Sequence, residues 1–125
     1  MDSCPCGSGK TYNQCCRQYH DGKAAPTAET LMRSRYSAYV LRNGAYLHRS
    51  WHGSTRPNKK GLMQLPPTEW LGLEIVRTEQ GGEQDTAGIV EFIARYQDGG
   101  QPGQLHETSR FVKEGGRWYY VAGEY

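Results

Sequence analysis

All four cysteines of the chain fall within its first sixteen residues. They form two close pairs, Cys4 with Cys6 and Cys15 with Cys16, on either side of an eight-residue loop. Four thiols at such spacing are the ligands that one tetrahedral zinc ion collects in a closed structural site. The segment is too short and polar to build a hydrophobic core of its own. The spacing therefore predicts one structural zinc ion per chain, with all four thiols as its ligands.

Disulfides are the main alternative use of clustered cysteines. Adjacent Cys15 and Cys16 would strain a mutual disulfide, and Cys4 and Cys6 are awkward partners too. The N-terminus lacks the pattern of a secretory signal, and no segment approaches the about 18 apolar residues of a membrane span. We therefore expect a cytoplasmic protein with reduced thiols. His20 can replace a thiol as ligand, but four thiols suffice, so we expect it beside the site or on the surface.

The net charge of the chain limits which classes of partner we expect. The formal net charge of +2 is too small to argue for nucleic acid, and the short basic run at 56–60 resembles a solvated loop. Association with a ribosome or nucleic acid through the zinc-binding segment and the nearby Arg17 and Lys23 is therefore the weakest hypothesis. Residues 7–11 imitate the end of a phosphate-binding loop, but the first glycine of that motif is absent. ATP binding there is not expected.

The middle of the chain has helical periodicity. Residues 21–26 read as a linker, and Thr27 is placed to cap a helix that begins at Ala28. Four apolar residues then recur at three- and four-residue spacing: Met32, Tyr36, Tyr39 and Val40. Gly44 is expected to end this helix, and a second, shorter helix is expected over 45–51. Residues 52–67 read as a long connection.

After residue 67 the period changes to two, which is typical of strands. Strands are expected around 71–75, 89–96, 105–112 and 117–122, with glycine-rich hairpin turns between them. Helices followed by an antiparallel meander predict an α+β domain, in which the helices cover one face of the sheet. With 125 residues and 11% aromatic side chains, the chain can build one core of ordinary size.

The cysteine segment resembles the SEC-C zinc motif. The resemblance is carried by Cys4-Pro5-Cys6-Gly7-Ser8-Gly9-Lys10, by Tyr12 and by Cys15-Cys16. The final ligand of that motif is often histidine, and Cys16 stands at its place here. The SecA translocation ATPase carries a similar segment, which contacts the SecB chaperone. The resemblance thus implies a zinc-binding knob with a precedent for protein contacts.

The rest of the chain resembles the YchJ family of bacterial proteins, for which no function is assigned. The matching stretches are residues 31–39, 51–52, 69–73, 109–111 and 118–120. This resemblance implies a domain like nuclear transport factor 2 (NTF2), with helices packed into the concave side of a curved sheet. The expected organisation is a SEC-C knob over residues 1–20 and an NTF2-like domain over residues 27–125.

Three side chains are candidates for acid–base chemistry. Glu91 interrupts an apolar strand between Ile89 and Ile93, and burial there would raise its pKa. An ion pair with Arg95 or Arg110, or exposure on the outer face of the sheet, is the alternative that we favour. His52 and His106 titrate near neutral pH, but a structural or surface role is favoured for each because no carboxylate partner is visible.

Arg35 lies one helical turn from Tyr39, near the apolar stripe of the predicted helix. We expect it to form a buried salt bridge with a carboxylate of the sheet. Binding of an anionic ligand in a pocket of the domain is the alternative.

Two main functions follow. The leading hypothesis is a non-enzymatic binding or adaptor protein that contacts a protein partner through the zinc knob, with room for a small-molecule ligand in the domain. Such an adaptor should expose an apolar or aromatic patch around the knob. The alternative is a small enzyme of isomerase, dehydratase or hydrolase type, which should bring two ionisable groups together in a pocket.

Overall fold

The computed structural model describes residues 3–124, so the outermost residues of the predicted segments, 1–2 and 125, lie outside it. In this part of the chain, short helical segments come first and strands follow. The helical segments are η1 (Tyr12–Gln14), α1 (Cys16–His20), α2 (Ala28–Val40), α3 (Gly44–Arg49) and α4 (Lys59–Leu62). The strands are β1 (Glu69–Gln80), β2 (Ala87–Asp98), β3 (Gln101–Glu114) and β4 (Arg117–Glu124).

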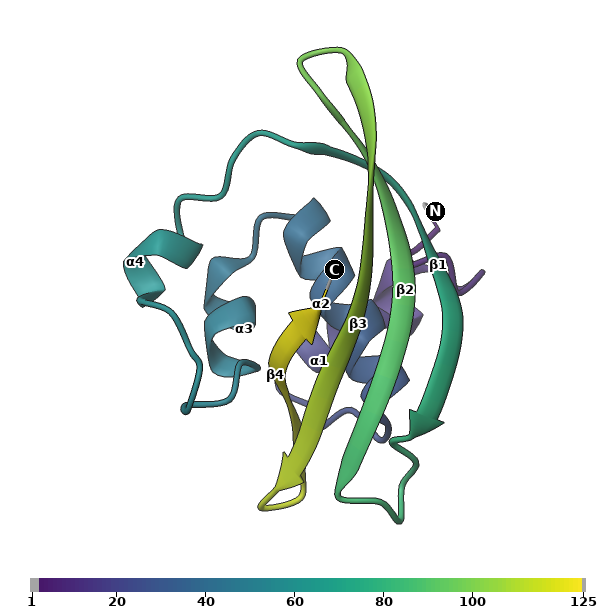
Figure 1. Ribbon diagram of the computed structural model, residues 1–125, viewed down its shortest axis with the longest axis vertical. Helices are drawn as coiled ribbons and strands as arrows, with labels where there is room; N and C mark the ends of the chain where they lie inside the picture. The colour runs from purple at the N-terminus through teal and green to yellow at the C-terminus, as the bar shows by residue number, and fades with distance from the viewer. Residues whose placement is uncertain (1–2, 125) are drawn as a thin grey trace.

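The strands form one antiparallel sheet in the order β1-β2-β3-β4, so each pairs with its neighbour in sequence. The sheet is strongly curved, and the helices lie together on one side of it (Figure 1). Bulges interrupt the register of β1 in two places and of β4 in one, and a bulge bends the strand that carries it. The predicted α+β fold is confirmed.

Alternation along the strands decides which face of the sheet is buried. In β2, Val90, Phe92 and Ala94 are buried against the helices, whereas Glu91 points to the other face. In β3 the buried face carries Glu107, Ser109 and Phe111. The strands are longer than predicted, and two of the three hairpins close through only two residues. The β2–β3 turn, for example, uses Gly99 and Gly100 with φ of 55° and 85°.

Helix α2 is the central helix of the layer. Thr27 caps it as predicted, since its Oγ1 accepts a hydrogen bond of 3.1 Å from the backbone N–H of Thr30. The backbone N–H of Ala28 donates to the carbonyl of Gly81, at the turn after β1. Helix α2 also contacts α1, α3, β1, β2 and β4. Its position therefore fixes both the knob and the sheet.

Two local predictions were wrong. Helix α2 ends at Val40, before Gly44, because Arg42 takes a left-handed φ of 59° and Asn43 caps the next helix. Gly44 is instead the first residue of α3, where the carbonyl of Leu62 leaves no space for a side chain. The connection expected over 52–67 contains the short helix α4, whose Leu62 is buried.

Among the described residues, no helix is both long and apolar enough to cross a membrane.

Candidate functional site

The four cysteine sulfurs lie together in the knob, which we define as residues 3–20. Each Sγ lies within 4.8 Å of the other three. The Sγ atoms of Cys6 and Cys15 are 3.6 Å apart, and those of Cys15 and Cys16 are 4.0 Å apart. Tetrahedral coordination with Zn–S distances of about 2.3 Å requires sulfur–sulfur distances of about 3.8 Å. The thiols therefore fit a single tetrahedral ion.

Backbone hydrogen bonds shape the loop that brings the two pairs together. The N–H of Cys4 donates to the carbonyl of Lys10, and the N–H of Gly7 donates to the carbonyl of Cys4. Gly7 and Gly9 have φ of 78° and 86°, which side chains disfavour. The sequence Gly7-Ser8-Gly9 is thus needed for the chain reversal between the cysteine pairs.

Hydrogen bonding within the cluster favours deprotonation of one thiol. The contact with Cys16, followed by those with Ser8, Cys4 and Cys15, lowers the pKa of Cys6 to about 4, although burial opposes this shift. The same contact with Cys6, together with burial, raises the pKa of Cys16. A divalent ion stabilises further thiolates because it replaces the protons that the remaining thiols carry.

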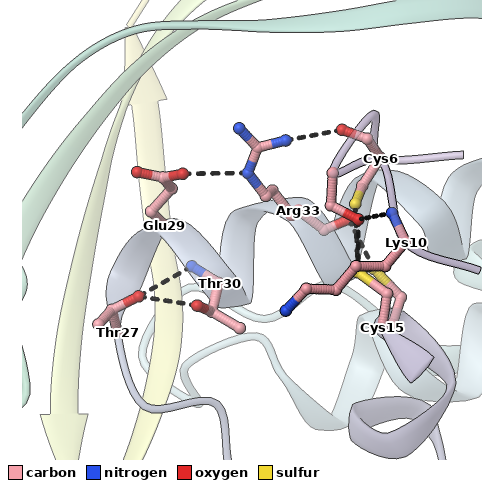
Figure 2. Close-up of polar contacts among 9 residues, drawn as sticks. Cys6, Lys10, Cys15, Thr27, Glu29, Thr30 and Arg33 are labelled. Atoms are coloured by element: carbon pink, nitrogen blue, oxygen red, sulfur yellow. Dashed lines mark hydrogen bonds and ion pairs between the residues drawn. The ribbon is translucent and has the colours of Figure 1, made fainter. Parts of the chain in front are cut away.

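The knob docks onto one face of α2. The Ser37 hydroxyl donates to Sγ of Cys16 at 3.2 Å and lies 3.5 Å from Sγ of Cys4. Arg33 extends from the same helix, and its Nη1 donates to the carbonyl of Cys6 at 2.8 Å, while its Nε pairs with Glu29 (Figure 2). Cys4, Cys6 and Cys16 are buried. The cluster is therefore continuous with the domain core.

His20 is the last residue of α1, is buried, and is not among the grouped ligands. Its Nε2 lies 2.7 Å from the carbonyl of Ser34, and its Nδ1 lies 2.7 Å from the hydroxyl of Tyr12. The ring also packs against Tyr46 at a centroid distance of 4.6 Å. Burial lowers the pKa of His20, so the neutral ring is favoured. His20 thereby joins the knob to α2 and α3.

Glu91 and His106 are brought together, but on the sheet face that points away from the helices. Nε2 of His106 lies 2.6 Å from Oε2 of Glu91, and Nε of Arg77 lies 2.7 Å from Oε1. The hydrogen bonds from His106 and Arg77 lower the pKa of Glu91. Glu91 thus forms an ion pair, but the predicted partners Arg95 and Arg110 were wrong, because the register between β1 and β2 places Arg77 opposite Glu91.

His52 also has a carboxylate partner that the sequence did not reveal. It follows α3, and its Nε2 lies 2.7 Å from Oε2 of Glu114 at the end of β3. Its Nδ1 lies 2.7 Å from the hydroxyl of Ser54. Neither His52 nor the Glu91–His106 pair lines the cavity between the helices and the sheet.

That cavity has a volume of about 210 Å³ and is walled mainly by aromatic rings. Arg35 lines it and is buried, but the predicted salt bridge with a sheet carboxylate is absent among the described residues. Instead, Nη1 donates to the carbonyl of Leu47 and to the hydroxyl of Ser50. The guanidinium also lies over the rings of Trp51 and Tyr120, at 4.9 and 4.6 Å.

Glu107 is the cavity residue that sequence reasoning missed. Its carboxylate accepts hydrogen bonds from the hydroxyls of Ser109 and Tyr120. Burial lowers the pKa of Arg35, and the charge of Glu107 is among the influences that oppose this shift. The alternation of Leu105, Glu107, Ser109 and Phe111 was the available signal, because it places a carboxylate on an apolar strand face.

The knob lacks the apolar patch that the adaptor hypothesis led us to expect. The exposed large hydrophobic residues of the described chain are Leu41, Met63, Leu71 and Val76. None of these belongs to the knob, whose exposed loop carries Ser8 and Lys10. Any partner of this surface therefore meets polar groups.

The curved sheet, its helices and the docked cysteine cluster define a SEC-C motif protein with an NTF2-like domain. The SEC-C motif matches residues 2–18, and the middle NTF2-like domain of YchJ matches residues 27–123. The chain belongs to the YchJ family.

Relatives in other bacteria extend over nearly the whole chain. A UPF0225 protein of Xanthomonas campestris is 55% identical, over 96% of this chain and 92% of the relative. A UPF0225 protein of Chromobacterium violaceum is 51% identical, over 97% of this chain and 91% of the relative.

Solved structures show the same fold. The solution structure of a SEC-C motif containing protein from Rhodopseudomonas palustris has a TM-score of 0.87 and 36% identity, over 99% of this chain and 98% of that one. The crystal structure of a SEC-C motif containing protein from Psychrobacter arcticus has a TM-score of 0.84 and 30% identity, over 98% of this chain and 81% of that one.

Proposed function

We propose that the chain is a non-enzymatic binding module whose knob is held by one structural zinc ion. The observation that carries this proposal is the grouping of the four sulfurs within 4.8 Å of one another. Four thiolates in tetrahedral array suit Zn²⁺, and an Fe–S site is the alternative for such a set. Because the protein supplies all four ligands, no position is left for a substrate.

Elemental analysis of the purified chain tests the metal. We expect one zinc per chain and no stoichiometric iron or sulfide. Cys16→Ser should lose zinc, whereas Ser54→Ala, a substitution in an exposed loop, should keep it. Full zinc occupancy in Cys16→Ser, or iron with sulfide in the wild type, contradicts the proposal.

Chelation tests the structural role. Removing zinc should abolish hydrogen-exchange protection in residues 3–20 and weaken it in α2, because Ser37 and Arg33 contact the cluster. Protection in β2 and β3 should persist, since β2 pairs with β3 along its whole length. Unchanged protection in the knob after complete zinc removal contradicts a structural role.

The adaptor part of the proposal assigns the exposed loop of the knob to a protein partner. Its support is the SEC-C resemblance, together with the exposure of Lys10 and Arg17 in the knob. Their charge favours an acidic partner surface, although Asp21 pairs with Arg17.

Crosslinking in cells tests this assignment. A crosslinkable residue placed at Ser8 should capture a protein, and Lys10→Glu should reduce the yield. The matched control is Lys60→Glu, at an exposed position of helix α4, and it should leave the yield unchanged. Equal capture by both charge reversals, or no capture at Ser8, contradicts a partner at the knob.

An enzyme remains the second candidate, and one observation favours it. Arg35 and Glu107 both line the cavity, which is the convergence of ionisable groups expected of an active site. The acid–base candidates Glu91, His52 and His106 lie elsewhere, so such an enzyme would rely on Glu107 for proton transfer.

A further inference from the structure

The cavity between α2 and the sheet holds two buried charges that do not pair with each other. Arg35 is 3% exposed and Glu107 is 5% exposed, yet they form no ion pair in the described part of the chain. Burying a charge is costly unless opposite charges and hydrogen bonds compensate it. Two charges beside one cavity therefore need an explanation.

The hydrogen bonds of Arg35 and Glu107 leave specific atoms available. Both bonds of Arg35 come from Nη1, so Nε and Nη2 have no hydrogen-bond acceptor among residues 3–124. Both bonds to Glu107 end on Oε2, so within the same range Oε1 accepts none. Each side chain thus forms hydrogen bonds with the protein through one polar atom and leaves its other polar atoms available to a ligand.

These free atoms face accessible space. Among the described residues, Thr11 Oγ1 is the only fully enclosed side-chain nitrogen or oxygen without a partner. Because the free atoms of Arg35 and Glu107 are not enclosed in that way, solvent-sized molecules reach them, and the cavity is the space that both residues line. The cavity therefore offers two donor nitrogens and one acceptor oxygen to a guest molecule.

The surroundings define the shape and charge of that guest. Tyr39 and Trp70 wall one part of the cavity, and Trp51 and Tyr120 wall the part beside Arg35. Aromatic walls favour a flat, apolar ring. Because Arg35 and Glu107 carry opposite charges, a guest that spans both needs no net charge of its own, which keeps its desolvation cost low.

We propose that the cavity binds a small, net-neutral planar ring compound of the lactam type. Its N–H donates to Oε1 of Glu107, and its carbonyl accepts from the free nitrogens of Arg35. The ring lies among the aromatic side chains. This site is separate from the zinc cluster and does not depend on the proposed role of the knob.

Binding of three matched ring compounds to the zinc-loaded chain, followed by amide NMR shifts, tests the proposal. The probes are 2-pyridone, benzoate and benzylammonium, which are a neutral donor–acceptor ring, an anion and a cation. We expect 2-pyridone to bind about tenfold more tightly than either ion, with saturable shifts at Tyr39, Leu105 and Glu107. Tighter binding of either ion, shifts confined to other surfaces, or no saturable shift with any probe overturns it.

Glu107→Gln supplies an internal control through the order of affinities. Removing the carboxylate charge leaves Arg35 unopposed, so benzoate should become the better ligand and 2-pyridone the weaker one. The matched variant Glu91→Gln, on the other face of the sheet, should keep the wild-type order. If Glu107→Gln proves unfolded, Tyr120→Phe, which removes one hydrogen bond to Glu107, should narrow the preference for 2-pyridone. An unchanged order in a folded Glu107→Gln, or an unchanged preference in Tyr120→Phe, contradicts the proposal.

Discussion

Arg33 and Cys6 lie 27 residues apart in sequence, and Nη1 of Arg33 donates to the carbonyl oxygen of Cys6 across 2.8 Å (Figure 2). Because Cys6 is fully buried and belongs to the thiol cluster, this bond joins the cluster to α2 directly. Glu29 holds the same guanidinium from one turn earlier in the helix.

Replacing Arg33 with Met keeps the aliphatic stem but removes this link. We expect a loss of about 1–3 kcal/mol in the free energy of unfolding, as for a hydrogen bond that involves a charged group. Zinc transfer to a competing chelator should become faster as well. The control is Arg95→Met, which removes an exposed pair with Glu74 on the sheet and should change neither quantity measurably. Equal chelation rates in all three proteins would contradict a link between Arg33 and the knob.

Glu91 should make the stability of the sheet depend on pH. Its pKa is lowered from the ordinary value of 4.5 by hydrogen bonds from His106 and Arg77. A carboxyl group with a lowered pKa stabilises the fold at pH values above its pKa in the unfolded chain. This contribution disappears as the pH falls through its pKa in the folded chain. Urea unfolding should therefore show Glu91→Gln to be less stable than the wild type at neutral pH, with the two converging in acid. A difference that stays constant with pH would mean that the carboxylate charge plays no part.

His20 should remain neutral at a pH at which an exposed histidine begins to charge. Burial lowers its pKa below the ordinary 6.5, and the contact with the Ser34 carbonyl only partly offsets this. The free energy of unfolding is therefore undiminished by this group above pH 6.5. It declines as the pH falls toward the lowered pKa, since the unfolded chain takes up the proton first. NMR titration of the ring in the zinc-loaded protein measures the value directly, and a midpoint above 6.5 would contradict it.

Gly123 should be needed for the position of Glu107. A side-chain carbon on Gly123 would overlap the Glu107 carboxylate, so Gly123→Ala should displace that group and cost about 1–3 kcal/mol in unfolding free energy. Gly72→Ala is the matched control, because the equivalent space beside Gly72 in β1 is open. Calorimetric unfolding of both variants checks the difference. Equal effects would show that the fit between Gly123 and Glu107 is not tight.

Local chemistry explains which parts of the fold were predictable. The cysteine spacing, the Thr27 cap and the period-two strands each depend on neighbours in sequence, and the structure confirms the grouping, the cap and the strands. The prediction that Gly44 ends a helix was wrong because its role is decided by the carbonyl of Leu62, eighteen residues later. The turn propensity of a glycine depends on its neighbours in sequence and does not predict its packing against a distant segment.

The candidate site divides in the same way. The spacing of the four cysteines was enough to predict that they group together. The pairing of His106 with Glu91 depends instead on the register between β2 and β3. Glu107 was overlooked because Glu91 interrupts a more apolar strand. Only the sheet curvature and the helix positions decide which of the two carboxylates faces the interior.

Helix α2 is a wall shared by two sites. Its Arg33 and Ser37 side chains contact the thiol cluster, while Arg35 and Tyr39 line the cavity. If the proposed guest and the proposed zinc ion both stabilise the same position of this helix, each raises the affinity of the chain for the other by the same factor. Loss of zinc in a cell would then release the guest from the cavity, although the zinc ion and the guest occupy separate sites.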